Sequence, residues 1–481
     1  MVFELVGSRV LAPHFGTSIF VWTNIIGVIL GSLSLGYWLG GKIADREHNY
    51  STLSIILILA GAFILLDTVG KDAVFEVVKR TTSHSGIGSL ISSVVLFTVP
   101  SIFLGMISPY AARLKMQSVT TSGETVGNLY ALSTLGSITG TFLAGFLLIP
   151  LIGSTKIFLF LSATLVIIST IVYSSKLLAI KVLLLLSIVG SYIVADIAQA
   201  QEMKQDILTL ESAYNYVRIY DTKEIVPSGE AVKLMVTNIQ ASSGMFLGSD
   251  ELVFDYTKFY RLGSHFKSNI SSALMLGGAG YSYPKDFLAS VPGARLDVVE
   301  IDPKLTELAH DYFRLPRDNP RLKIYHEDGR IFLNNASSSQ YDVIYGDAFS
   351  SLHSIPYQLT TKEAVEKMFD ALKSDGVVLV NIISAIEGEK GQFLRAEYAT
   401  FKSVFPQVYI FPVTSPSKGE EVQNIMLVAL KSSNEPSFIS SNPELQSYLD
   451  HRWTKEINLD KPLLTDDFAP VDSYINKITA H

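Results

Sequence analysis

The 481-residue chain contains no cysteine, so disulfide bonds, zinc sites built on cysteine and thiol catalysis are excluded. Charged residues are also scarce: they make up 17% of the chain, whereas apolar residues make up 48%. About 25% charged residues is usual for a soluble globular protein. The scarcity of charge therefore argues against a purely soluble protein, and the apolar content excludes intrinsic disorder.

The few charges are unevenly distributed along the chain. Residues 1–200 carry 11 Lys or Arg and 8 Asp or Glu, whereas residues 201–481 carry 27 and 37. A nucleic-acid surface needs positive charge, so the acidic second part argues against nucleic acid as a partner. Its charge suits small cationic partners instead. The two parts are predicted to be different kinds of domain.

Long apolar runs fill the first 200 residues, and each can cross a bilayer, which takes about 20 helical residues. They are residues 17–40, 51–70, 86–110, 126–155, 157–175 and 177–200. We predict that residues 1–200 form a transmembrane domain of about six helices, with the lipid bilayer as a partner and the cell membrane as the location. Asp67 is the one acid within the second run, and its place near the end of that run indicates an interfacial position.

The orientation of this predicted domain does not follow from its loops. The positive-inside rule compares the Lys and Arg residues that flank the spans on the two sides. Six lie on one side and six on the other: Lys42, Arg46, Arg113, Lys115, Lys176 and Lys181 against Arg9, Lys71, Lys79, Arg80, Lys156 and Lys204. Residues 1–13 resemble the end of an element, so a preceding helix is expected to be missing from this chain.

From residue 211 onwards, short apolar strands replace the long runs. Residues 214–221 and 231–238 alternate like strands, which predicts a small β domain over residues 201–265. Further strands are predicted at residues 273–276, 295–301, 322–326, 341–345, 376–382, 408–411 and 424–430, and helices at 283–290, 303–313, 329–335, 361–372 and 391–404. This alternation predicts a parallel, doubly wound Rossmann-like α/β domain over residues 266–481, with a helical tail after about residue 434.

Glycines and acids follow the predicted strands of this domain. Gly277, Gly278 and Gly280 form a turn after the first strand, which lets the backbone approach a ligand closely. An acid about 20 residues later can accept hydrogen bonds from ribose hydroxyls. Because ligands bind at the carboxyl ends of such strands, we predict an adenosyl site that also contains the residues after the second, third and fourth strands: Glu300, Asp302, Asp328, Gly329 and Asp347.

The run GGAGYSYPKDFLASVPGARLDVVEID, with HEDGRIFL and YDVIYGDAFSS, resembles the spermidine synthase (polyamine aminopropyltransferase) family. ESAYNYVRIY and TNIQASSGMFL resemble the small N-terminal β domain of that family. GYWLGGKIADR and VGNLYALSTLGSITGTFLAGF resemble the membrane part of fused spermidine-synthase-like membrane proteins. The resemblance implies a methyltransferase-type sheet, decarboxylated S-adenosylmethionine as co-substrate, a small amine as acceptor, a homodimer, no metal and no permanently bound cofactor.

The resemblance also assigns roles to individual residues. Glu300 matches the ribose-binding acid, Asp328 the acid beside the adenine, and Asp347 the aspartate that accepts a proton from the attacking amine. The substrate-binding positions implied are Tyr214, Gln240, Tyr256 and Ser350.

Two acids of the family are missing from this chain. Gly280 replaces the aspartate that holds the amine of the donor, and Ser350 replaces a second aspartate. Each ammonium group of a polyamine needs a charged partner when it loses water. Glu251, Asp255 and Glu387 are the candidate substitutes.

Three functions therefore remain open. The first is aminopropyl transfer to a polyamine or related amine, with the domain on the cytoplasmic side, where the adenosyl donor is made. The second is methyl transfer from S-adenosylmethionine, because the loss of the acid at Gly280 removes repulsion against the methionine carboxylate. The third is a non-catalytic membrane protein that binds or transports, because a fold alone does not establish an activity.

Overall fold

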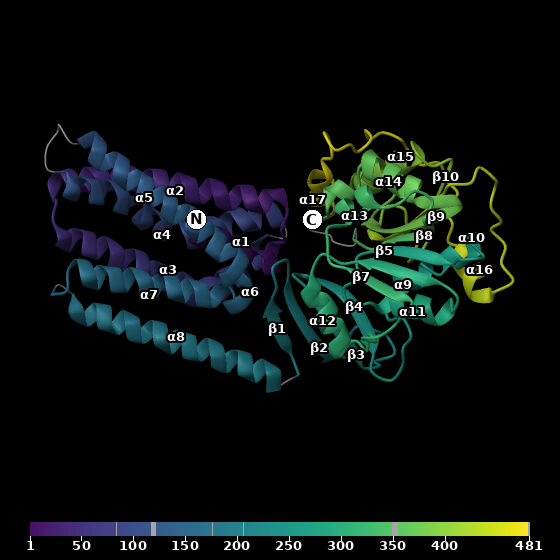
Figure 1. The fold of residues 1–481 in the computed structure, drawn as a ribbon, viewed down its shortest axis with the longest axis horizontal. Coiled ribbons are helices and arrows are strands. Elements are labelled where there is room, and N and C mark those ends of the chain that lie inside the picture. Colours follow the sequence, from purple (N-terminus) through teal and green to yellow (C-terminus); the bar gives the residue numbers. More distant parts are fainter. Residues whose placement is uncertain (83, 117–121, 176, 205, 349–354, 480–481) are drawn as a thin grey trace. The chain divides into compact units, whose positions relative to one another are not determined.

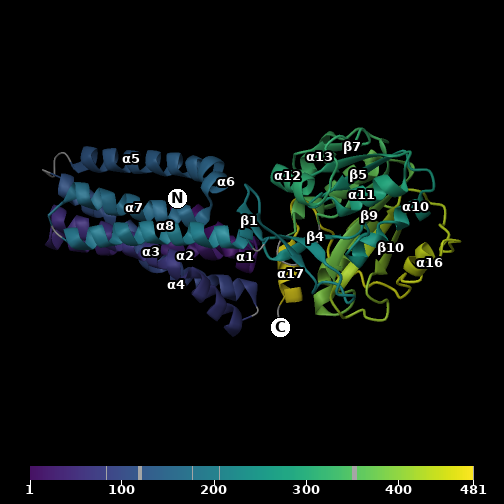
Figure 2. The same ribbon diagram turned by 90° about the horizontal axis from the view of Figure 1, so that it is seen from below.

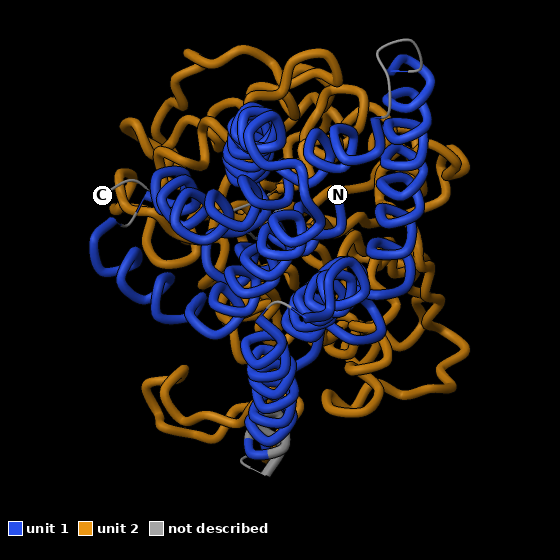
Figure 3. The backbone as a smooth tube through the Cα atoms, turned by 90° about the vertical axis from the view of Figure 1, so that its left-hand side faces the viewer, with its two compact units in different colours: residues 1–216, 481 blue, residues 217–480 orange. Residues whose placement is uncertain are grey.

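The computed structural model describes the chain except residues 83, 117–121, 176, 205, 349–354 and 480–481. Contacts divide the chain into two compact units, residues 1–216 and residues 217–480 (Figure 3). The domain boundaries predicted at residues 200 and 265 stay predictions. Each unit is described by itself.

The first unit consists of helices and ends in one short strand (Figure 1). Its elements are α1 (Val2–Phe15), α2 (Ile19–Arg46), α3 (Tyr50–Thr81), α4 (Ser85–Lys115), α5 (Ser122–Leu143), a π-helical turn (Ala144–Leu148), α6 (Ile149–Ile152), α7 (Ser154–Val172), α8 (Leu178–Lys204) and β1 (Leu208–Glu211). Among the described residues, six stretches are long and apolar enough to cross a membrane: Ile19–Arg46, Tyr50–Thr81, Ser85–Lys115, Ser122–Ile152, Ser154–Val172 and Leu178–Ala198. They confirm the six helices predicted from the apolar runs.

Glycine allows the two most closely packed helices of this unit, α2 and α4, to approach each other. A Cβ atom added to Gly36 would lie 2.2 Å from the backbone oxygen of Ile102, and one added to Gly105 would lie 2.6 Å from the backbone oxygen of Leu33. Such close approach of backbones is typical of helices that pack within membranes.

Asp67 does not lie near the end of its helix. Helix α3 continues to Thr81, and the Asp67 side chain is buried, with 8% of its surface exposed. Its Oδ2 atom has no hydrogen-bond partner among the described residues. The apolar run 51–70 predicts a position near the end of a helix for Asp67, but α3 extends well beyond this run.

The second unit begins with a small antiparallel sheet. Strands β2 (Tyr216–Thr222) and β3 (Val232–Thr237) match the two predicted strands, and β4 (Gln240–Phe246) pairs with β3. Two short helices follow, α9 (Asp255–Phe259) and α10 (Leu262–Phe266). Strand β4 and the two helices were not predicted.

A seven-stranded sheet with the order β10-β11-β9-β8-β5-β6-β7 follows (Figures 1 and 2). Its strands are β5 (Ser272–Leu276), β6 (Arg295–Val299), β7 (Leu322–Tyr325), β8 (Tyr341–Gly346), β9 (Leu372–Ser384), β10 (Gln407–Pro412) and β11 (Gln423–Leu430), and its helices are α11 (Ser282–Ser290), α12 (Pro303–Tyr312), α13 (Gly329–Asn335), α14 (Lys362–Ala371) and α15 (Gln392–Lys402). The Rossmann-like prediction is confirmed.

Two details of this prediction need correction. Five neighbouring strands pair in parallel, in the order β7-β6-β5-β8-β9. Strand β11 is antiparallel to both of its neighbours, β9 and β10. A hairpin rather than a helical crossover joins β10 to β11, and a hairpin can join only antiparallel strands. The predicted helical tail is mostly irregular and contains two short helices, α16 (Pro443–Leu449) and α17 (Val471–Thr479).

The centre of the sheet fixes the place where a ligand can bind. All six residues of β8 are buried, as expected for a strand covered on both faces. One core cluster joins strand residues such as Ile344 and Val380 to residues of α13, α14 and α15 such as Phe332, Val365 and Phe393. The strand order reverses direction at β5, which lies between β6 and β8. Ligands bind at such a switch point, beyond the carboxyl ends of the strands.

Candidate active site

The glycine-rich turn after β5 packs directly against the end of β8. Gly277 has a φ of 95°, and a Cβ atom there would lie 3.2 Å from the carbonyl carbon of Asp347. A side chain there would strain the backbone and crowd the residue that follows β8. The Gly277 N–H donates to the carbonyl of Val299, and the Asp347 N–H donates to that of Leu276. These bonds bring the ends of β5, β6 and β8 together.

The carboxylate of Glu300 holds this turn in place. Its Oε2 atom accepts hydrogen bonds from the N–H groups of Gly278 and Ala279, both at 2.9 Å, and its Oε1 atom accepts one from Asp302 at 3.0 Å. Burial raises the pKa of Glu300, and the three backbone N–H groups oppose the rise. A carboxylate offers about four acceptor sites, so one remains for a ligand hydroxyl.

Asp302 and Asp328 each begin a helix at the ligand-binding edge of the sheet. Asp302 caps α12, and Asp328 caps α13 by accepting the N–H of Arg330 at 2.8 Å. The second oxygen of Asp328 lies 3.3 Å from the side-chain nitrogen of Gln358. Gln358, which was not predicted, therefore extends the polar edge beside Asp328 and Gly329.

Asp347 directly follows β8 and lines a narrow cavity, whose wall also includes Tyr256, Ser243, Ser282 and Gly278. The hydroxyl of Tyr256 donates to Oδ2 of Asp347 at 3.4 Å. Burial raises the pKa of the Asp347 carboxyl from 3.8 to about 7. Polar groups of Tyr260, Asn381 and Tyr256 act in the opposite direction and limit the rise. The carboxyl group can therefore gain or lose a proton near neutral pH.

Aromatic rings surround Asp347 on one side. Tyr256 stacks on Phe254 with ring centroids 6.0 Å apart, and the Tyr260 hydroxyl donates to the carbonyl of Gly346 at 2.8 Å. Burial, and next the charge of Asp347, raise the pKa of both tyrosines well above the ordinary value. Both hydroxyls therefore keep their protons. Tyr260, which was not predicted, lies four residues after Tyr256. This spacing places two side chains on one side of a helical segment, so it could have indicated Tyr260.

Ser243 of β4 occupies the space beside Gly280. Its Oγ atom accepts a hydrogen bond from the Gly280 N–H at 2.9 Å, and a Cβ atom added to Gly280 would lie 2.6 Å from the Ser243 Cβ atom. An aspartate at position 280 would therefore require Ser243 to move. Sequence pattern alone does not reveal Ser243, because its contact with Gly280 joins two elements that are separate in the chain.

Not every predicted site residue lies at this cavity. Gln240 begins β4 but does not line the cavity. Tyr214 is 45% exposed and belongs to the first unit, and Ser350 lies outside the described residues. The roles proposed for these three residues stay predictions.

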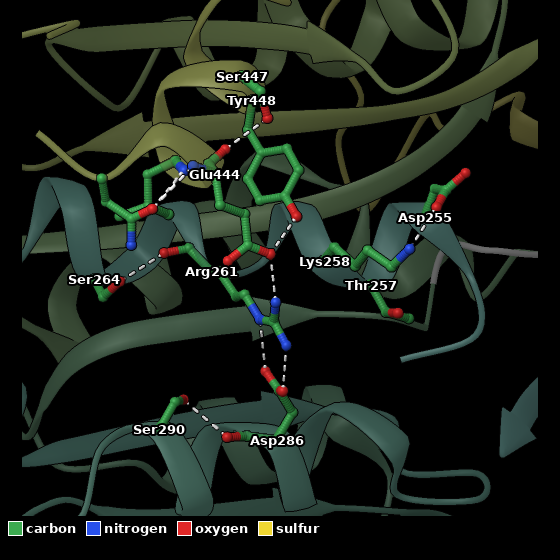
Figure 4. Close-up of polar contacts among 12 residues, drawn as sticks. Asp255, Thr257, Lys258, Arg261, Ser264, Asp286, Ser290, Glu444, Ser447 and Tyr448 are labelled. Atoms are coloured by element: carbon green, nitrogen blue, oxygen red, sulfur yellow. Dashed lines mark hydrogen bonds and ion pairs between the residues drawn. The ribbon is translucent and has the colours of Figure 1, made fainter. Parts of the chain in front are cut away.

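The candidate substitutes for the missing acids are also absent from the cavity lining. Glu251 is exposed, and Asp255 is 78% exposed and bound to Lys258 at 2.8 Å (Figure 4). Glu387 is 43% exposed and lies 3.5 Å from Lys455. None of the three lines the cavity as the described residues form it.

Arg261 fixes the position of the tyrosine-bearing segment. Figure 4 shows its guanidinium between Asp286 of α11 and Glu444 of α16. Two parallel hydrogen bonds join it to Asp286, at 3.0 and 2.6 Å. Such a bidentate pair restricts orientation as well as distance, so Asp286 is engaged and is not available to a ligand.

The comparisons with known proteins agree with this geometry. A family model described as the spermine/spermidine synthase domain matches residues 262–437. Residues 262–437, which make up less than half of the chain, are therefore similar to that domain. The match includes the Gly277–Gly280 turn, Glu300, Asp328 and Asp347, whereas the helices of the first unit lie outside it.

Individual relatives match about half of the chain or less. A polyamine aminopropyltransferase of Vibrio vulnificus is 27% identical over 237 residues, which are 46% of this chain and 75% of the relative. A probable polyamine aminopropyl transferase of Bifidobacterium longum is 32% identical over 224 residues, 42% of this chain and 49% of the relative. The crystal structure of a probable spermidine synthase from Corynebacterium glutamicum matches with 25% identity and a TM-score of 0.42, covering 50% of this chain and 84% of that one.

Proposed function

We propose that the protein is a membrane-anchored aminopropyltransferase, which transfers an aminopropyl group from decarboxylated S-adenosylmethionine to a polyamine or a related primary amine. The observation that carries the proposal is Asp347, whose pKa burial raises to about 7, beside the Gly277–Gly280 turn. A base with a pKa near the working pH is well matched to proton transfer. The six apolar helices support the membrane anchor.

In the proposed reaction, the acceptor ammonium first gives a proton to the Asp347 carboxylate. The free amine nitrogen then attacks the aminopropyl carbon attached to the sulfonium. The carbon–sulfur bond breaks, its electron pair stays on sulfur, and neutral methylthioadenosine leaves. The reaction depends mainly on holding the two substrates in line. No metal or permanently bound cofactor takes part in the proposed reaction.

Glu300 is proposed to bind the ribose and Asp328 the adenine edge. Asp302 and Gly329 would support the same ligand from the starts of α12 and α13, and Gly277, Gly278 and Gly280 would let it approach the backbone. The arrangement of these residues at the carboxyl ends of β5, β6 and β7 supports this assignment. A homodimer remains a prediction.

Methyl transfer from S-adenosylmethionine is the second candidate. One observation favours it: Ser243 and Gly280 fill the place where the resemblance puts an acid, so no carboxylate there repels the carboxylate of the methionine tail.

We expect decarboxylated S-adenosylmethionine to raise the thermal unfolding temperature of the purified chain in detergent more than S-adenosylmethionine does. Methylthioadenosine should then be released when a panel of primary amines, including putrescine and spermidine, is added. Greater stabilisation by S-adenosylmethionine, together with methylated product, would establish methyl transfer instead. Binding of either nucleoside without turnover of any amine would favour a non-catalytic role.

The cytoplasmic location of the domain can be tested with one added cysteine, because the chain has none of its own. Ser338 lies exposed between α13 and β8. In intact cells, the Ser338→Cys variant should resist a membrane-impermeant maleimide and should react only after permeabilisation. Equal labelling before and after permeabilisation would place the domain outside and remove it from its cytosolic donor. The unmodified chain is the control.

A further inference from the structure

A second cavity lies at the amino ends of the sheet strands, at the opposite end from the candidate active site. It has a volume of about 360 Å³, and its wall includes residues from the starts of β5, β6 and β8 and from β7. Pockets for small molecules usually measure roughly 300–1,000 Å³. A strand rises about 3.3 Å per residue, so Ser272 in this wall lies roughly 16 Å from Gly277 of the glycine-rich turn.

Two cations of this wall have no carboxylate partner. Arg295 of β6 and Lys323 of β7 line the cavity, and neither forms an ion pair with any residue that the structure describes. Lys323 pairs in register with Asp297, which follows Arg295 by two residues and therefore shares its face of the sheet. Neighbouring strands lie about 4.8 Å apart, so the two long side chains can reach one ligand group.

A third cation of the wall, Arg321, is already engaged. Its guanidinium donates to the carbonyl of Leu288 at 2.7 Å and to that of Val291 at 3.1 Å. These carbonyls lie at the end of α11, where unpaired backbone oxygens attract a cation. Arg295 and Lys323 therefore remain as the two cations of the wall that a ligand can use.

Asp297 is held in the wall by a short chain of hydrogen bonds. The side-chain nitrogen of Gln340 donates to the Tyr341 hydroxyl at 2.9 Å, and this hydroxyl donates to Oδ2 of Asp297 at 2.7 Å. Burial, and next the hydrogen bond to Asp297, raise the pKa of Tyr341 well above its ordinary value, so the hydroxyl keeps its proton. Within the described part of the chain no donor reaches Oδ1 of Asp297, so this atom can accept a hydrogen bond from a ligand.

Aromatic contacts keep Lys323 beside the cavity. Its ammonium lies 4.5 Å from the centre of the Tyr325 ring, and that ring packs edge-on against Phe332 of α13 with centroids 4.8 Å apart. A cation–π contact attracts the ammonium group without neutralising its charge. The charge of Lys323 therefore stays available at the wall.

The charges of this wall suit one kind of ligand. A phosphate monoester carries about 1.5 to 2 negative charges at neutral pH, which matches two free cations, whereas a single carboxylate matches one. A guanidinium group also fits phosphate oxygens through two parallel hydrogen bonds. The oxygen of Asp297 requires a donor as well, which a hydroxyl-bearing body attached to the phosphate supplies.

We propose that the second cavity binds a small organic phosphate, such as a sugar phosphate. The phosphate group contacts Arg295 and Lys323, and a hydroxyl of the body donates to Asp297. This site is separate from the candidate active site, no bond is made or broken in it, and it does not depend on the proposed aminopropyl transfer.

Titration calorimetry on the full chain in detergent tests the proposal with three probes: glucose 6-phosphate, glucose and inorganic phosphate. Glucose 6-phosphate should bind more tightly than either of the other two, because each of them offers only one of the two groups that the wall recognises. Saturation with methylthioadenosine should leave its Kd unchanged, because the adenosyl site lies at the other end of the strands. Absence of binding at millimolar glucose 6-phosphate, or its complete displacement by methylthioadenosine, would overturn the proposal.

Variants of the two cations locate the phosphate. Arg295→Gln and Lys323→Gln should each weaken binding of glucose 6-phosphate by about tenfold or more, as expected when a charged hydrogen-bonding partner is lost. Both side chains are exposed, so both variants should fold, and each tests the site by itself. The matched control is Arg317→Gln, which removes an exposed arginine that is paired with Asp311, and its binding should be normal. Equal weakening in all three variants would show that only the overall charge attracts the phosphate.

Asp297→Asn tests the contact with the body of the ligand. The amide has one oxygen, which can accept the hydrogen bond of Tyr341, and its NH₂ group then faces the ligand and cannot accept. The preference for glucose 6-phosphate over inorganic phosphate should therefore fall by about tenfold. An unchanged preference would show that the wall does not recognise a hydroxyl-bearing body and would overturn the proposed ligand class.

Discussion

Replacing Asp347 with Asn is expected to lower the rate of aminopropyl transfer by roughly 10²–10⁴-fold, the usual contribution of a positioned base. The amide has the shape of the carboxyl group but cannot take the proton from the acceptor. Nucleoside affinity should stay nearly unchanged, because the adenosyl contacts are assigned to Glu300 and Asp328. Methylthioadenosine release and nucleoside binding are measured for both proteins.

The matched control is Asp375→Asn, which makes the same chemical change on an exposed carboxylate that is paired with Lys267. That variant should turn over at the normal rate. If Asp347 only stabilises the backbone at the end of β8, Asn should replace it well, and equal rates in the Asp347→Asn variant would remove this residue from the mechanism.

The pH dependence provides a second measurement on the same variant. Because burial raises the pKa of Asp347 from 3.8 to about 7, the base is fully ionised only above pH 7, and kcat/KM should rise with pH through about 7. The folded state also binds this proton more tightly than the unfolded state, so Asp347 should lower stability as the pH rises from about 4 to 7. The Asp347→Asn variant should not show this decrease in stability. Thermal unfolding temperatures of both proteins at pH 5 and pH 8 measure the difference.

Glu300→Ala should weaken the binding of methylthioadenosine by about 1.5–3 kcal/mol, the usual contribution of hydrogen bonds to a charged group, or roughly 10- to 150-fold in Kd. Stability should fall as well, because the N–H groups of Gly278, Ala279 and Asp302 would lose their acceptor. Titration calorimetry and thermal unfolding measure the two effects.

Two further variants keep the Glu300 test decisive if the alanine variant is unstable. Glu300→Gln has the same volume, but its NH₂ group cannot accept hydrogen bonds from the backbone, so binding should still weaken. Glu307→Ala removes an exposed carboxylate of α12 that is paired with Lys304, and its binding should be normal. Unchanged affinity in Glu300→Gln would show that the ribose binds elsewhere.

Local pattern was enough to locate most of the fold. Apolar runs in the first 200 residues predicted the six long helices, since length and lack of charge are properties of each segment alone. The predicted helix at residues 329–335 coincides with α13, because Asp328 is a strong N-cap. The alternation of strands and helices predicted the sheet. The prediction of an all-parallel sheet was wrong at β11, because a hairpin rather than a helix joins β10 to β11.

Local pattern failed where strand or helix signals are weak. Strand β4, with the sequence QASSGMF, contains glycine, alanine and two serines, which have little preference for strands. Helices α9 and α10 have five residues each, too few for a helical period to be recognised. Ser243 comes from β4 and was missed, whereas Tyr256 of α9 was expected only because of the resemblance.

The sequence by itself determined the two kinds of domain, the order of strands and helices along the chain and the acids at the strand ends, because composition, periodicity and motif spacing are properties of neighbouring residues. Only the tertiary structure decided that Glu300 holds the glycine turn, that Ser243 fills the space beside Gly280 and that Asp347 lies half-buried beside two tyrosines. Each of these facts depends on side chains from separate elements meeting at one edge of a sheet. Burial and hydrogen bonding there set the pKa of Asp347 and the charge of the cavity wall, and no segment of the chain contains that information alone.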